Sequence, residues 1–184
     1  SIYYIDFSKS SYNIGGSALA QTLDKVGNSC PDIKDSQYFA EAFNIFQDLI
    51  KNNFIISGHD VSSGGLITTL LELCFSENGL GADIDFSDIG DQKTVDLLFC
   101  ENPAIVFQGK RTIEKKLREK KINFFKIGKV DRTGNLKIKN NRDQINLCVE
   151  KYRDLWFKKS YLMDIQQSGI TKAKERFENF KKQP

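Results

Sequence analysis

Short apolar runs alternate with longer runs of helical spacing along the chain, and this alternation predicts a layered α/β domain. Runs of apolar or alternating residues predict strands at residues 3–7, 54–57, 82–86, 104–108, 124–130 and 136–138. The second run is β-branched and apolar, so we expect a buried strand there. The last two flank Asp131-Arg132-Thr133-Gly134-Asn135, which predicts a hairpin and therefore a mixed sheet.

Helices are predicted between these strands. The clearest lies between a cap at Asp35 or Ser36 and a stop at Asn52. Its apolar stripe consists of Phe39, Phe43, Phe46 and Ile50. Residues 66–75 are apolar on nearly every side, which predicts a buried helix. The remaining helices are predicted at residues 18–26, 91–99, 112–121, 145–157 and 171–180.

Composition narrows the classes of function. The 184 residues are 40% hydrophobic and 28% charged, which fits a folded domain. A net charge of +3 does not indicate a nucleic-acid partner, and we interpret the basic runs at residues 110–121 and 172–182 as solvated helix faces. No apolar run approaches the roughly 18 residues of a membrane span. Four dispersed cysteines and a single histidine favour reduced, cytoplasmic thiols over disulfides or a zinc site.

The strongest candidate for chemistry is the segment Gly58-His59-Asp60-Val61-Ser62-Ser63-Gly64-Gly65, which we expect to be a loop between a strand and a helix. Ligands of α/β sheets gather at the C-terminal ends of strands, and a helix N-terminus suits phosphate. Gly64 and Gly65 allow a close backbone approach, and Ser62 can bond a phosphate oxygen. Asp60 is a hard oxygen donor of the kind that Mg²⁺ takes beside a nucleotide.

Plainer explanations of the same residues remain open. Ser62 or Ser63 before two glycines also makes an ordinary helix N-cap, and His59 could bond only to backbone. The segment matches neither a Walker A loop nor a Rossmann fingerprint. A second glycine turn, Gly15-Gly16-Ser17, could lie near a substrate phosphate or act as a packing hinge.

Several ordered segments together resemble one family. They include residues 3–7, 15–21, 59–66 and 72–75, then Leu98-Phe99-Cys100-Glu101 and Trp156-Phe157-Lys158-Lys159-Ser160-Tyr161. In this order they resemble phosphoribosylformylglycinamidine synthase, and within it the second C-terminal domain of aminoimidazole-ribonucleotide-synthetase type. Asn102-Pro103 stands where that family has glycine, and Ser160 where it usually has threonine. Glu101 could be functional or a capping carboxylate, and Trp156 a docking or core aromatic.

The resemblance implies a fold and a reaction. The fold is the α/β layered domain with a mixed sheet and packed helices of such synthetases. The enzymes are ATP-dependent ligases of purine biosynthesis, which convert formylglycinamide ribonucleotide and glutamine to formylglycinamidine ribonucleotide. ATP phosphorylates the amide oxygen, and ammonia from a glutaminase domain displaces the phosphate. In the large single-chain form, the half that contains this domain holds Mg-ADP that looks structural.

The resemblance also implies the roles of individual residues. Asp60 would be a ligand of the magnesium ion and Ser62 a contact of ATP or ADP, with His59, Gly64 and Gly65 beside them. Residues 15–17 would lie near the substrate. The other metal ligands and the glutaminase triad would belong to neighbouring domains, so no catalytic residue is expected in this chain.

The chain starts at Ser1 without a methionine, and we expect a fragment of a longer protein. Residues 1–150 would form the synthetase-type domain and residues 151–184 a helical tail toward the glutaminase domain. The implied partners are that domain, the preceding nucleotide-binding domain and a small-molecule substrate, without nucleic acid or membrane. We expect the isolated fragment to be inactive.

Two other functions remain open. The chain could belong to a relative such as aminoimidazole ribonucleotide synthetase or selenophosphate synthetase, although the Trp156–Tyr161 segment argues against them. It could also be a non-catalytic binding or interface module that uses its basic helices, and such phosphate binding should weaken steeply with salt.

Overall fold

The computed structural model describes residues 1–179, and its centre is one seven-stranded sheet. The strand order is β2-β4-β1-β5-β3-β6-β7, and every neighbouring pair is antiparallel except β3 and β6. The strands are β1 (Ile2–Asp6), β2 (Ile55–Val61), β3 (Gly81–Asp85), β4 (Ala104–Gly109), β5 (Phe125–Asp131), β6 (Asn135–Asn140) and β7 (Asp143–Cys148). The predicted mixed α/β sheet is confirmed.

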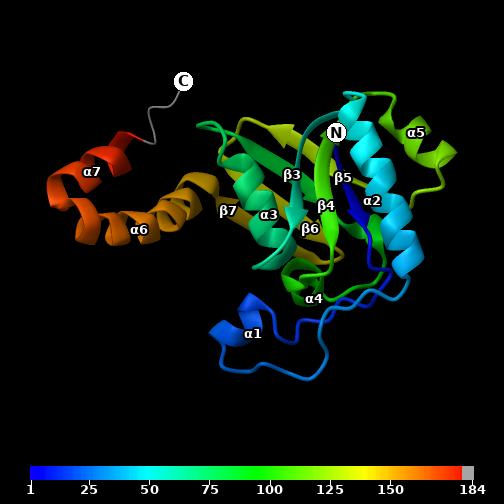
Figure 1. Cartoon of the computed structure of the whole chain (residues 1–184), viewed down its shortest axis with the longest axis horizontal. Coiled ribbons are helices and arrows are strands. Elements are labelled where there is room, and N and C mark those ends of the chain that lie inside the picture. Colours follow the sequence, from blue (N-terminus) through cyan, green and yellow to red (C-terminus); the bar gives the residue numbers. More distant parts are fainter. Residues whose placement is uncertain (180–184) are drawn as a thin grey trace.

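Helices pack on both faces of the sheet (Figure 1). They are α1 (Ala18–Thr22), α2 (Ser36–Lys51), α3 (Gly65–Cys74), α4 (Thr94–Phe99), α5 (Ile113–Glu119), α6 (Val149–Ser168) and α7 (Ile170–Asn179), with a 3-10 turn at Ser87–Ile89. Side chains of the central strand β1 alternate between the faces. Ile2 and Tyr4 join the core formed with α3 and α4, whereas Tyr3 and Ile5 join the core formed with α2 and α5.

The core-facing side of α2 differs from the predicted stripe. Its cap at Asp35 is confirmed, because this carboxylate accepts a hydrogen bond from the Tyr38 N–H at 2.9 Å. The buried side chains, however, are Ala42, Phe46 and Leu49. The helix is apolar on more than one side, so the pattern left its rotation open.

The strand predicted to be buried at residues 54–57 is instead the edge strand β2. It pairs with β4 alone, and Ile56 is 61% exposed. β2 is also longer than predicted, since backbone pairing with β4 continues through His59 and Asp60 to Val61. The glycine turn is correspondingly shorter, and the two polar residues lie on the strand.

The hairpin predicted around residues 131–135 is wrong, although its turn chemistry is present. The Asp131 carboxylate accepts hydrogen bonds from the N–H and hydroxyl of Thr133. β3 nevertheless lies between β5 and β6, the two strands that this turn connects. A Cβ on Gly81 at the start of β3 would lie 2.4 Å from the Asn135 carbonyl oxygen, so glycine is needed for β3 to pass so closely.

The hairpin that the sheet does contain joins β6 and β7. Its two-residue turn places Asn141 at a φ of +52°. The helix predicted from residue 145 therefore begins only at Val149. Ile145 and Leu147 alternate with exposed neighbours, as in a half-buried strand, and two apolar residues fit either period in so short a run.

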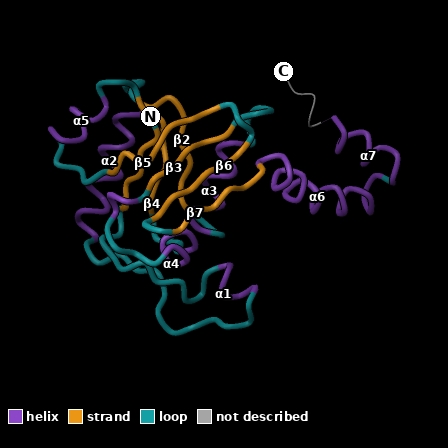
Figure 2. Tube along the Cα trace, turned by 180° about the vertical axis from the view of Figure 1, so that it is seen from behind, coloured by secondary structure: helices purple, strands orange, loops and turns teal. Residues whose placement is uncertain are grey.

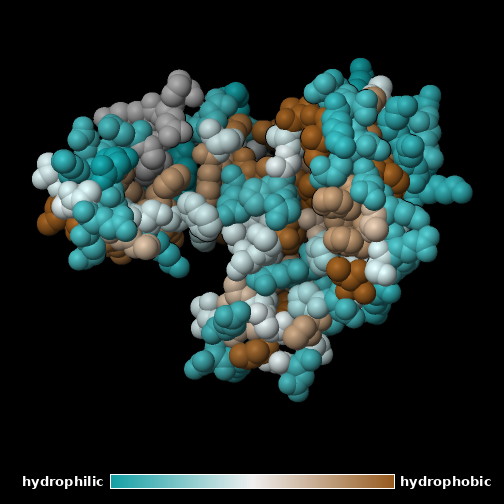
Figure 3. Space-filling model, viewed as in Figure 1, coloured by the Kyte–Doolittle hydropathy of each residue, from teal (hydrophilic) through white to brown (hydrophobic). Residues whose placement is uncertain are grey.

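Two parts of the chain stand away from the sheet. The loops around α1 form a lobe, and α6 and α7 extend as a two-helix arm (Figures 1 and 2). Figure 3 shows open space between the lobe and the arm, with apolar surface on both. α1 ends at Thr22, not at residue 26 as predicted, and Leu23 is 59% exposed.

α7 confirms the last predicted helix up to Asn179. Its predicted final residue, Phe180, and the end of the basic run at residues 172–182 lie outside the described residues. Within residues 1–179, no helix is both long enough and apolar enough to cross a membrane.

Candidate functional site

The end of β2 carries the predicted metal ligand. The Asp60 side chain is 76% exposed. Its backbone carbonyl oxygen accepts a hydrogen bond at 3.2 Å from the hydroxyl of Thr69, a buried residue of α3. The strand end is therefore attached to α3, while the Asp60 carboxylate remains accessible to solvent.

Both ring nitrogens of His59 have partners within the chain. Nδ1 lies 2.7 Å from the Asp60 carbonyl oxygen and therefore donates to it, and Nε2 lies 3.2 Å from Glu72 Oε2 on α3. Both partners are hydrogen-bond acceptors, so the two ring nitrogens of His59 face oxygen atoms of the Asp60 backbone and of Glu72. His59 thus makes the backbone bond expected in the plainer explanation and also links β2 to α3.

Backbone geometry requires both glycines of the turn after β2. Gly64 is the N-cap of α3 with a φ of +92°, so neither serine occupies that position, and Gly65 has a φ of +72°. A Cβ on Gly65 would lie 2.7 Å from the Leu98 carbonyl oxygen at α4. At Gly65, a close approach is therefore made to the protein's own backbone, whereas a Cβ on Gly64 would meet the Thr68 side chain. The Gly65 N–H donates to the Ser62 carbonyl oxygen at 2.9 Å, which closes the turn.

One carboxylate joins the two glycine turns. Glu101 Oε1 accepts hydrogen bonds from the Gly64 N–H at 2.7 Å and from the Ala18 N–H at 2.9 Å. Gly64 is the N-cap of α3 and Ala18 is the first residue of α1, so the negative charge lies at the N-terminal ends of two helices, where their dipoles favour it. The capping role expected as an alternative for Glu101 is therefore confirmed. A single oxygen atom of Glu101 accepts a hydrogen bond at the N-terminal end of each of the two helices.

The first glycine turn is closed by its own loop. The Gly15 N–H donates to the Ser29 carbonyl oxygen at 2.8 Å, and a Cβ on Gly15 would lie 2.5 Å from that oxygen. Gly16 has a φ of +73°. Ser17 is fully buried, and its hydroxyl accepts from the Ala20 N–H as the N-cap of α1. Close packing at Gly15, the left-handed φ of Gly16 and the capping role of Ser17 thus account for the three residues, while their proximity to a substrate stays a prediction.

Residues 98–103, from the last turn of α4 to the start of β4, are the part of the site that sequence reasoning undervalued. The Phe7 N–H donates to the Pro103 carbonyl oxygen at 2.9 Å, and the buried Asn102 amide donates to the Ser11 carbonyl oxygen at 3.2 Å. The Leu-Phe-x-Glu match indicated that Glu101 was of interest. Its two donors, 37 and 83 residues away in sequence, are apparent only in the folded chain.

Burial changes the acidity of side chains beside this segment. It raises the pKa of Asp6, although hydrogen bonds from Ser8 offset part of this rise. It raises the pKa of Tyr12 to about 12 and that of Cys100 to about 11. The pKa of buried Cys74 is also raised to about 11. All four cysteines are unpaired, as predicted, and these two are neutral thiols rather than thiolate nucleophiles at pH 7.

The residues present fit a metal ion only in part. Among residues 1–179, no group of three or more His, Cys, Asp or Glu side chains could hold a metal. The exposed Asp60 carboxylate can serve as one hard oxygen ligand of Mg²⁺, which usually takes one or two protein carboxylates together with phosphate oxygens and water.

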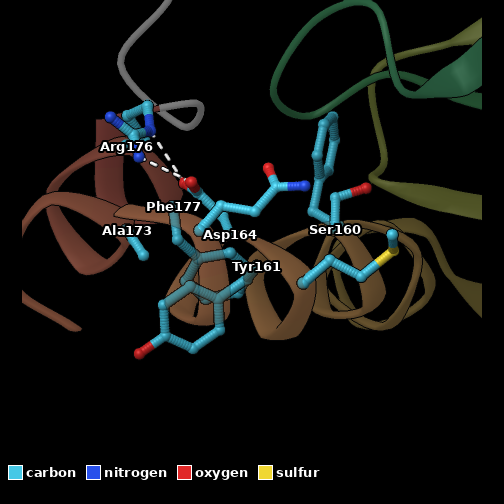
Figure 4. A pocket seen from close by; sticks show the side chains of 9 residues that line it. Ser160, Tyr161, Asp164, Ala173, Arg176 and Phe177 are labelled. Atoms are coloured by element: carbon cyan, nitrogen blue, oxygen red, sulfur yellow. Dashed lines mark hydrogen bonds and ion pairs between the residues drawn. The ribbon is translucent and has the colours of Figure 1, made fainter. Parts of the chain in front are cut away.

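A cavity of about 540 Å³ lies between α6 and α7 (Figure 4). The Tyr161 and Phe177 rings stack across it with their centroids 4.7 Å apart. Arg176 binds the Asp164 carboxylate through two nitrogens, at 2.7 and 2.6 Å. The two charged residues that line the cavity thus pair with each other, and the residues around it mainly pack α7 against α6.

The seven-stranded sheet with helices on both faces defines a layered α/β domain. Residues 9–140 match the family described as AIR synthase related protein, C-terminal domain, and the chain belongs to this family. Within it, the chain is similar to the probable phosphoribosylformylglycinamidine synthase, chloroplastic/mitochondrial, of Arabidopsis thaliana. The two are 33% identical over 171 residues, which cover 89% of this chain but only 12% of that relative.

Solved structures share the fold at lower identity. T. maritima PurL complexed with FGAR matches with a TM-score of 0.62 and 15% identity, covering 83% of this chain and 27% of that one. T. maritima PurL complexed with ATP matches with a TM-score of 0.59 and 12% identity, covering 81% and 24%. The chain therefore corresponds to one part of these much longer proteins.

Proposed function

We propose that this chain is one domain of a phosphoribosylformylglycinamidine synthase, an ATP-dependent carbon–nitrogen ligase with glutamine as amide donor. Such an enzyme makes the amidine, ADP, phosphate and glutamate from formylglycinamide ribonucleotide, glutamine and ATP. The observation that carries the proposal is the Glu101 carboxylate, which brings three segments of family resemblance together at one place. The similarity along 89% of the chain supports it.

The contribution of this domain is half of a Mg-nucleotide site. Asp60 supplies one carboxylate ligand to Mg²⁺, and the Ser62 hydroxyl contacts a phosphate oxygen of ATP or ADP. The N–H groups of Gly64 and Gly65 are engaged by Glu101 and Ser62, so they do not bind the nucleotide. The two glycines contribute instead by letting the backbone of the turn lie close to the nucleotide. Asp60 would hold the magnesium ion, and the ion would neutralise charge on the nucleotide phosphates. The residues that react with the substrate would belong to other domains.

The rest of the site belongs to other domains of the same polypeptide. A preceding nucleotide-binding domain completes the metal shell and holds most of the nucleotide. A following glutaminase domain supplies ammonia, and residues 151–184 lead toward it from the domain at residues 1–150. The unpaired cysteines support a reducing compartment, and we propose the cytoplasm.

The test is the reaction of the full-length protein and of an Asp60→Asn variant. We expect the full-length protein to form the amidine from formylglycinamide ribonucleotide, glutamine and ATP. Asp60→Asn keeps the shape but removes the charge that binds Mg²⁺, so Mg-ADP affinity should fall roughly 10–100-fold, as for disrupted metal sites. Calorimetry measures the affinity and chromatography measures the product.

The matched control is Asp88→Asn, which removes an exposed carboxylate elsewhere on the domain and should leave both measurements unchanged. A full-length protein that forms no amidine would overturn the proposed function. Normal Mg-ADP binding by Asp60→Asn would overturn only the metal-ligand role. Amidine synthesis from ammonia by residues 1–184 alone would show that the domain is not merely part of a site.

A further inference from the structure

We propose that Glu101 is a positioning residue that holds the turn at residues 62–65 against the turn at residues 15–18 without touching a ligand. The inference rests on the function proposed above and assigns a specific task within that site. Its basis is a single atom, Oε1, which receives a backbone N–H from Gly64 and another from Ala18.

Each turn is also held by contacts within the chain other than its bond to Glu101. Gly15 lies so close to the Ser29 backbone that even a Cβ would be 2.5 Å from it, and Gly65 lies as close to α4. Within the second turn, the Ser62 carbonyl oxygen is tied to the Gly65 N–H. Any displacement of Gly64 therefore moves Ser62, the proposed nucleotide contact, and with it the end of β2.

The carboxylate itself is presented from a fixed backbone. On its C-terminal side, the Asn102 amide donates to the Ser11 carbonyl oxygen, and the Pro103 carbonyl oxygen accepts from the Phe7 N–H. On its N-terminal side, the Cys100 N–H donates to the Asp96 carbonyl oxygen at 3.0 Å within α4. A cap for one helix would need only one of the two bonds to Oε1, whereas both are needed to set one turn against the other.

The bond to Gly64 also restricts how this turn can meet a phosphate. The N–H groups of Gly64 and Gly65 are engaged within the chain, so neither is offered to a phosphate. The proposed ligand contacts are therefore the Ser62 hydroxyl and, through a metal, Asp60. Small errors in the placement of these side chains weaken a preorganised site strongly. Glu101 should therefore affect nucleotide binding from a distance.

Three substitutions in the full-length protein distinguish the effect of the length of the Glu101 side chain from the effect of its charge. Glu101→Gln keeps an acceptor oxygen at the same distance but removes the charge, whereas Glu101→Asp keeps the charge and shortens the side chain by one methylene. Glu101→Ala removes both. If position matters, Mg-ADP affinity should be near wild type in the Gln variant, lower in the Asp variant and at least roughly tenfold lower in the Ala variant.

Amide hydrogen exchange gives the direct readout. Protection of the Gly64 and Ala18 amides should fall together in the Ala variant, roughly tenfold to a hundredfold, because each loses a bond to a charged acceptor. It should be largely retained in the Gln variant. Glu119→Ala, which removes a carboxylate paired only with Lys115 and Lys116 among the ion pairs of the structure, should leave both amides and the affinity unchanged.

Two results would overturn the positioning role: wild-type exchange at both amides in the Ala variant, or an Asp variant that binds Mg-ADP normally while the Gln variant fails. The second would mean that charge alone matters. If Glu101→Ala does not fold, the Gln and Asp variants still decide the question. If the full-length protein makes no amidine, the proposed function fails, whereas the exchange of the two amides still tests the role of Glu101.

Discussion

At the scale of single residues, Gly65 is the position where the site tolerates least change. It combines a left-handed φ of +72° with a backbone neighbour that a Cβ would approach to 2.7 Å. We expect Gly65→Ala to lower the free energy of unfolding by about 2–4 kcal/mol, as the sum of backbone strain and overpacking. Urea denaturation followed by circular dichroism measures this loss.

Gly79→Ala separates the two contributions. Gly79 has a similar φ of +78°, but a Cβ there would meet no heavy atom within 4 Å. It should therefore cost only the strain, about 1 kcal/mol. Equal losses in the two variants would mean that the contact between the turn and α4 contributes nothing.

Sequence reasoning was most successful where a residue's local chemistry decides its role. The glycine turn at the start of α3 and the cap at Asp35 could both be expected from short segments. Glu101 was different, because a carboxylate before a strand is compatible with many environments. Its two donors come from distant turns, and only tertiary folding brings them together.

At the scale of elements, the same contrast explains the errors. The existence of most helices and strands followed from periodicity, but the pairing of strands did not. Turn chemistry at residues 131–135 predicted a hairpin, yet pairing through β3 buries Ile84 between β5 and β6. The rotation of α2 and the edge position of β2 likewise depend on neighbours far away in sequence, which a local pattern does not contain.

The α6–α7 arm supplies a prediction at this scale. α7 packs on α6 through the Tyr161–Phe177 stack and the Asp164–Arg176 pair (Figure 4). We expect the aromatic stack to carry a measurable part of the attachment, since stacked rings contribute beyond the apolar area that they bury. We expect Phe177→Ala to raise the rate of proteolysis within α7 roughly tenfold, without changing the unfolding midpoint of the sheet domain.

Limited proteolysis followed by mass spectrometry tests this attachment. Lys174→Ala on the exposed side of α7 is the control, since its pair with Glu178 is a surface contact at 3.8 Å. Equal cleavage rates in the two variants would assign the attachment of α7 to contacts other than the stack.

At the scale of the whole molecule, the incomplete site predicts how the isolated chain should behave. Within the described residues, the candidate nucleotide site offers one exposed carboxylate, and the amides of its two glycines are already engaged. With so few contacts, residues 1–184 alone should bind Mg-ADP more weakly than about 1 mM, whereas the full-length protein binds it far more tightly. Calorimetric titration of both proteins measures the difference. Asp60→Asn should weaken the full-length protein and leave the fragment unchanged, because a lone aspartate gains little affinity without the other ligands. Micromolar binding by the fragment would show that the domain holds a complete site.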